Sequence, residues 1–121
     1  MSTEPAADDE LTLMNGTVRG KGFSRLLVAR FQRNGALRFE IEEWGARVEE
    51  FLDHLGGGDT YEYSYTVPKA RLADFLTTIG VDPTDPMTGL AKRWSGSKRS
   101  IELIDRLRAA QDTHRVRLSV R

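Results

Sequence analysis

Residues 61–80 constrain the fold more than any other stretch, because a strand pattern and a helix pattern meet there at one proline. Residues 61–67 alternate three tyrosines and a valine with polar residues, which predicts a half-buried strand. Pro68 lacks an N–H for a sheet, but its φ suits the first turn of a helix. Apolar residues at helical spacing then lead to Gly80, a typical C-cap residue. We therefore expect a strand followed directly by a helix, with the tyrosines in the core; a binding platform is the alternative.

Two further segments predict the rest of the sheet. Residues 23–31 and 37–44 are strand-like runs separated by Asn34-Gly35, a pair that favours a hairpin with a type I′ turn. Residues 114–121 alternate cleanly and predict a closing strand, with Leu118 and Val120 facing inward. A short edge strand is expected at residues 11–14, which makes a sheet of four or five strands.

Three further helices are expected, at residues 48–55, 86–94 and 98–111. The first has apolar residues at helical spacing, including Phe51 and Leu55, and ends at three glycines. The resulting order is ββαβαααβ, with too few strand–helix alternations for a parallel fold. We therefore predict an α+β domain, with an antiparallel or mixed sheet of 4–5 strands and about four helices mainly on one face.

Length and composition limit the class of protein. The chain has 121 residues, which is the size of one domain. Residues 1–10 are acidic and polar, so they are predicted to form a disordered tail. It has no cysteine, so a bacterial-type cytoplasm is the expected setting. No apolar run is long enough to cross a bilayer. We expect residues 11–121 to form one cytoplasmic domain without a membrane anchor.

Charge is unevenly distributed along a chain whose net charge is zero. Residues 36–62 carry eight acidic and two basic side chains, whereas residues 86–121 carry nine basic and three acidic ones. These segments could offer separate surfaces to partners, or they could neutralise each other in the folded protein. The sequence leaves both interpretations open.

A small interaction protein is the first functional hypothesis. No nucleophile, base or cofactor motif stands out, whereas the acidic segment has a tryptophan that could anchor a partner. An inhibitor, an immunity-type protein or an adaptor would act in this way, with acidic groups steering a basic partner. The predicted partner-binding residues are Glu40, Glu42, Trp44, Glu49 and Asp53.

Binding of nucleic acid or of another phosphoanion is the alternative. The start of the helix at residues 98–111 follows a serine turn rich in cations, and a tryptophan there could stack on a base. A neutral domain is poorly suited to a polyanion, which favours the protein partner. The predicted anion-binding residues are Lys92, Arg93, Trp94, Ser95, Ser97, Lys98 and Arg99.

An enzyme whose Glu and Tyr side chains meet in a cleft is the second alternative. Neither a catalytic residue nor a cofactor is predicted from the sequence. Glu50 and His54 have a spacing that metal ligands use, but they make an incomplete shell, so no metal site is predicted.

Overall fold

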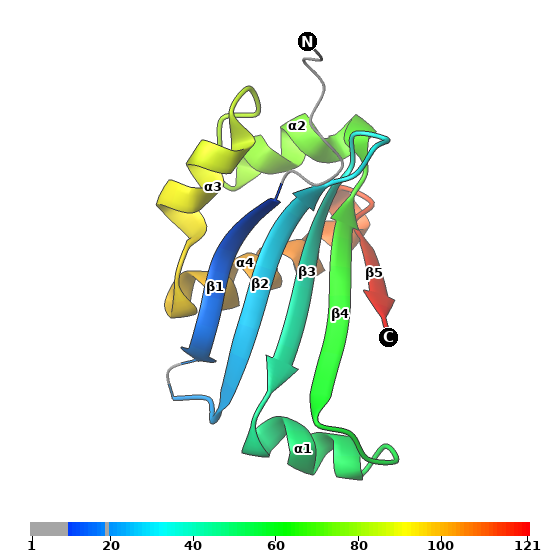
Figure 1. The fold of residues 1–121 in the computed structure, drawn as a ribbon. Coiled ribbons are helices and arrows are strands. Elements are labelled where there is room, and N and C mark those ends of the chain that lie inside the picture. The colour runs from blue at the N-terminus through cyan, green and yellow to red at the C-terminus, as the bar shows by residue number, and fades with distance from the viewer. Residues whose placement is uncertain (1–9, 19) are drawn as a thin grey trace.

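The computed structural model describes residues 10–18 and 20–121, which form a five-stranded sheet and four helices (Figure 1). The predicted tail lies outside the described residues except for Glu10, which begins the first strand. The strands are β1 (Glu10–Val18), β2 (Phe23–Phe31), β3 (Leu37–Trp44), β4 (Thr60–Val67) and β5 (Arg117–Val120). The helices are α1 (Ala46–Asp53), α2 (Lys69–Thr78), α3 (Pro86–Trp94) and α4 (Ser97–Thr113).

All strand pairs are antiparallel, and the strands lie in the order of the sequence. The long helix α4 crosses one face of the sheet, behind the strands in Figure 1, and α3 packs beside it against β1. The helix α1 lies at the end of β3 and β4. The predicted α+β class with helices mainly on one face is therefore confirmed. The edge strand expected at residues 11–14 is present as β1, so the sheet has five strands.

The core lies between the sheet and the helices. Leu27 and Phe39 from the central strands belong to the same buried cluster as Phe75 of α2 and Leu107 of α4. Burying each such side chain contributes about 1.5–3 kcal/mol. The tyrosines of β4 alternate with residues on the other face of the sheet and point to the helices, and Tyr65 is fully in the core.

The β2–β3 turn differs from the predicted type I′ turn. Gln32 pairs with Ala36 through a backbone bond of 2.8 Å, so three residues form the loop, and Gly35 takes the positive φ there while Asn34 does not. A two-residue loop would have shifted the pairing by one residue. Apolar residues of β3 would then have opposed polar positions of β2, so burial selects the longer loop.

We expect Gly35→Ala to lower the free energy of unfolding by about 1–2 kcal/mol, because an L-residue is strained at the φ of 86° found there. Denaturant unfolding measures this change. Arg33→Ala, in the same loop with an ordinary φ, should change it by less than about 0.5 kcal/mol. Equal effects of the two substitutions would contradict the assigned turn.

Two apolar stripes that were expected to be buried are partly exposed. In α1 only Val48 is buried, and Phe51 is 50% exposed. The helix ends at Asp53, before Leu55, which is 68% exposed. In β5, Leu118 and Val120 face the helix side but are 40% and 53% exposed. The reason is position, because α1 lies beyond the end of the helix layer and β5 is an edge strand.

Candidate functional site

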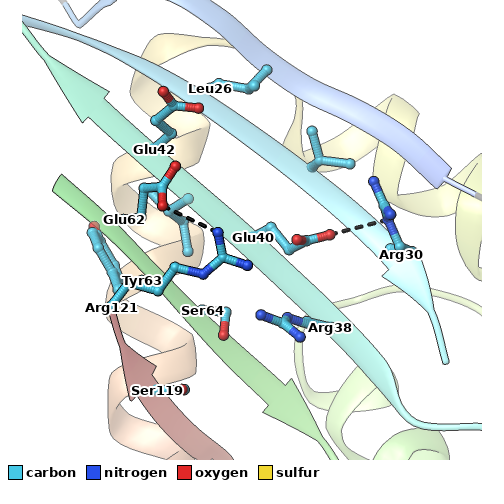
Figure 2. A pocket seen from close by; sticks show the side chains of 12 residues that line it. Leu26, Arg30, Arg38, Glu40, Glu42, Glu62, Tyr63, Ser64, Ser119 and Arg121 are labelled. Atoms are coloured by element: carbon cyan, nitrogen blue, oxygen red, sulfur yellow. Dashed lines mark hydrogen bonds and ion pairs between the residues drawn. The ribbon is translucent and has the colours of Figure 1, made fainter. Parts of the chain in front are cut away.

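The face of the sheet opposite the helices, which we call the open face, is the first candidate site. Strand alternation places mainly polar residues of β3 and β4 there, together with Leu26 and Val28 of β2, and no helix of the described chain crosses it in Figure 1. The strand register arranges its side chains into rows that run across the sheet. A hollow of about 180 Å³ lies in the middle, around Glu40 and Ser64 (Figure 2).

One row is strongly cationic. The register places Glu10, Arg30, Arg38, Thr66 and Arg117 side by side across all five strands, and we call this set the arginine row. Arg30 is directly opposite Arg38, an arrangement of like charges that disfavours the sheet. Arg30 is compensated, because it contacts Glu10 Oε2 at 2.6 Å and lies 3.0 Å from Glu40 Oε1 in an ion pair.

Arg38 is not compensated in this way. It forms no ion pair within residues 10–18 and 20–121, and its buried Nε has no hydrogen-bond partner there. It lies in the hollow of Figure 2, near Ser64 and Glu40. A guanidinium held without a counterion is suited to a carboxylate from outside the chain.

The opposite end of the open face is acidic and contains a tryptophan. Glu42 directly opposes Glu62, and of the two only Glu62 has an ion-pair partner among the described residues, Arg121 Nη1 at 3.2 Å. Beyond them lies a hollow of about 440 Å³, which we call the Trp44 hollow. Its lining residues are Leu26, Glu42, Trp44, Gly45, Glu49, Asp59 and Thr60.

The carboxylates of the Trp44 hollow lack internal partners. Within the described residues, Glu42, Glu49 and Asp59 form neither an ion pair nor a side-chain hydrogen bond. Trp44 is half-buried between them, so part of its ring remains available. The hollow thus combines three free negative charges with an aromatic surface.

The structure brings together three of the five predicted partner-binding residues. Glu42, Trp44 and Glu49 line the Trp44 hollow. Glu40 lies on the same face but is engaged with Arg30, and Asp53 is exposed on α1 without lining the hollow. These two residues therefore lie outside the site.

The alternative anion-binding segment does not form the predicted platform. Trp94 is 5% exposed, and its Nε1 donates to the Ile79 carbonyl at 2.9 Å, so the stacking role predicted for it is wrong. A bulky apolar ring next to the α3–α4 turn serves the core, where its N–H finds a backbone acceptor. Arg99 is paired with Glu102 at 2.9 Å, and the Ser95 hydroxyl donates to the Ala91 carbonyl.

The remaining residues of that segment do not restore the platform. Lys92, Arg93 and Lys98 are exposed, and Ser97 is half-buried as the first residue of α4. Without a stacking ring, three exposed cations could neutralise only a few phosphates, and the electrostatic gain scales with that number.

Sequence reasoning missed the arginine row and Asp59. Arg30, Arg38 and Arg117 are far apart in the chain, and only the register of four strands places them in one row. Strand parity was the available signal, because it assigns each of these side chains to the polar face. Asp59 lies in the loop before β4, where periodicity predicts nothing.

The described residues contain no group of three or more His, Cys, Asp or Glu side chains placed to hold a metal ion. No helix in residues 10–18 and 20–121 has the length and apolar character required to span a bilayer. Comparison with protein-family models, curated proteins and solved structures found nothing that matches this chain.

Proposed function

We propose that this chain is a non-enzymatic interaction protein that binds a basic segment of a partner protein in the Trp44 hollow. The observation that carries the proposal is the set of three unpaired carboxylates, from β3, α1 and the loop before β4, around a half-buried tryptophan at the edge of the open face. Aromatic anchors flanked by charge are typical of protein-binding surfaces. An inhibitor, an immunity-type protein or an adaptor in the bacterial cytoplasm would use such a surface.

The energetics of the acidic end of the open face support a cationic partner. Glu42 and Glu62 oppose each other across β3 and β4, which costs stability in the free protein. A lysine or arginine bound beside Glu42 would remove that repulsion and would pair with Glu49 or Asp59. The partner's charge would therefore steer association and would place its side chain against Trp44.

A capture experiment with matched variants tests this proposal. The purified chain is immobilised, lysate of its native host is passed over it at low salt, and retained proteins are identified by mass spectrometry. The proposal requires a basic protein that the unmutated chain retains and that Trp44→Ala or the double variant Glu42→Gln with Glu49→Gln does not. A control with the same charge change, Asp85→Asn with Asp112→Asn, alters exposed carboxylates elsewhere and should retain it.

The affinity for the captured partner should then follow the geometry. Trp44→Ala is expected to raise Kd by about 30-fold or more, the size of effect found for a central aromatic anchor. Kd should also rise with salt, because exposed charges are screened. Absence of any retained protein at low salt, or retention that Trp44→Ala does not change, would refute the proposal.

A further inference from the structure

A second candidate site lies on the other face of the sheet, in a cleft between α4 and β2–β4. It measures about 420 Å³, a size that suits a small ligand. Four aromatic residues contribute to its walls, and Tyr61 lies 5.1 Å from Tyr63 between ring centres. The lining residues are Lys21, Phe23, Arg25, Glu43, Tyr61, Tyr63, Tyr65, Ile101, Ile104, Asp105, Arg108 and Leu118.

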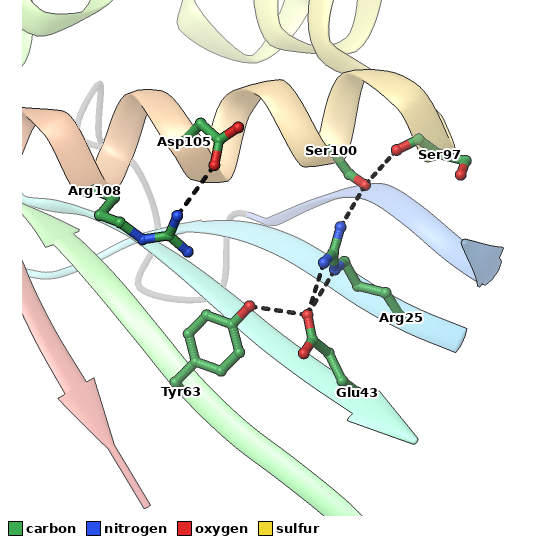
Figure 3. Close-up of polar contacts among 7 residues, drawn as sticks. All are labelled: Arg25, Glu43, Tyr63, Ser97, Ser100, Asp105 and Arg108. Atoms are coloured by element: carbon green, nitrogen blue, oxygen red, sulfur yellow. Dashed lines mark hydrogen bonds and ion pairs between the residues drawn. The ribbon is translucent and has the colours of Figure 1, made fainter. Parts of the chain in front are cut away.

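A buried polar network forms one wall of this α4 cleft (Figure 3). Oε2 of Glu43 accepts three contacts, from Arg25 Nε at 2.9 Å, Arg25 Nη2 at 2.8 Å and the Tyr63 hydroxyl at 2.9 Å. Arg25 Nη1 donates to the Ser100 hydroxyl of α4 at 2.9 Å. Arg25 is thus fully engaged, and one carboxylate oxygen of Glu43 takes all the donors.

Two polar atoms of buried residues in the cleft have no partner. Within residues 10–18 and 20–121, neither Oε1 of Glu43 nor the hydroxyl of Tyr65 forms a hydrogen bond. Glu43 is 9% exposed and Tyr65 is 2% exposed. Neither atom is among the fully buried atoms that lack a hydrogen bond in the described residues, so both remain accessible to a molecule in the cleft. An ionised carboxylate oxygen such as Oε1 of Glu43 forms a strong hydrogen bond with a donor.

The charges of the cleft indicate what kind of molecule fits. Glu43 is neutralised by Arg25, and Asp105 is paired with Arg108 at 3.1 Å, so the two carboxylates do not favour a free cation. Lys21, the remaining charged residue of the lining, is exposed, so water and salt screen its charge. The walls are aromatic, and rings stack well on planar molecules. We propose that the α4 cleft binds a small, uncharged, planar aromatic molecule whose N–H donates to Oε1 of Glu43.

Two probes that differ in a single group test the donor. Indole is planar, uncharged and carries one N–H, while 1-methylindole has the same ring without that donor. Each is titrated into the isotope-labelled full chain, and backbone amide shifts are followed by nuclear magnetic resonance. Indole should give saturable shifts at the residues of the cleft, and 1-methylindole should bind at least tenfold more weakly, as expected for a lost hydrogen bond to a charged group.

Two variants locate the bound probe without disturbing the network. Tyr61→Ala removes one half-buried wall and should weaken indole binding by about tenfold, a change within the range for one aromatic contact. Leu55 is exposed and lies outside the cleft, so Leu55→Ala should leave the affinity for indole unchanged. Absence of saturable indole shifts at the cleft, equal affinity for both probes, or no effect of Tyr61→Ala would each overturn the proposal. Because this cleft is on the helix side, these outcomes do not depend on the Trp44 hollow.

Discussion

Arg25→Met is expected to lower the free energy of unfolding by about 3–5 kcal/mol, because it removes one member of a buried ion pair. The substitution keeps a long apolar stem but leaves the carboxylate of Glu43 without its cation, in a side chain that is 11% exposed. Removing one member of a buried ion pair costs far more than the pair itself contributes. Urea unfolding followed by circular dichroism measures the change.

Matched variants separate the lost pair from the lost packing. The double variant Arg25→Met with Glu43→Leu removes both charges, and we expect it to recover most of the stability. Arg106→Met makes the same chemical change at an exposed position of α4 and should alter the free energy of unfolding by less than about 0.5 kcal/mol. If Arg25→Met costs no more than this control, Arg25 and Glu43 are not buried against each other as described.

The positions of Arg25 and Glu43 in the sequence already indicate that these two residues pair. Arg25 and Glu43 both fall at core-facing positions of their strands, in phase with Leu27 and Ile41. A charged residue in the apolar phase of each hairpin strand predicts that the two meet. Arg25 opposes Glu43 only when the β2–β3 loop has three residues. The predicted two-residue type I′ turn would shift the pairing of β2 with β3 by one residue.

Local patterns predicted the elements well because the deciding interactions are local. The alternation of β4, the proline after it and the spacing of α2 lie within one short stretch. Strand order and the arginine row depend on contacts between distant segments, which a single sequence does not encode in its periodicity. The acidic and basic segments neutralise each other only in part. Arg121 pairs with Glu62, while Arg38 and Glu42 stay unpaired in the described chain.

The end of β3 connects the two candidate sites. Glu42 and Trp44 face the Trp44 hollow, while Glu43 between them faces the α4 cleft. Strand alternation alone places adjacent residues on opposite faces. A partner on the open face and a small molecule in the cleft would therefore bind to neighbouring residues of one strand without competing for the same surface.

Stability at alkaline pH should depend on Tyr63. Burial raises the pKa of its hydroxyl well above the ordinary value, and the charge of Glu43 and the hydrogen bond to it raise the pKa further. The unfolded chain loses this proton near pH 10, whereas the folded chain retains it. The stabilisation is therefore complete below pH 10 and is lost progressively above it, at up to about 1.4 kcal/mol per pH unit.

Comparison with Tyr63→Phe tests this dependence, because the variant keeps the ring and lacks the titrating hydroxyl. The free energy of unfolding is measured for both proteins by urea unfolding at a series of pH values from neutral to above pH 10. Below pH 10 the two curves should run parallel, with Tyr63→Phe lower by about 1 kcal/mol for the lost hydrogen bond to Glu43. Above pH 10 the unmutated protein should lose stability faster, so the curves converge and then cross. Parallel curves through the alkaline range would show that Tyr63 does not retain its proton in the folded protein, which is incompatible with a buried hydroxyl donating to Glu43.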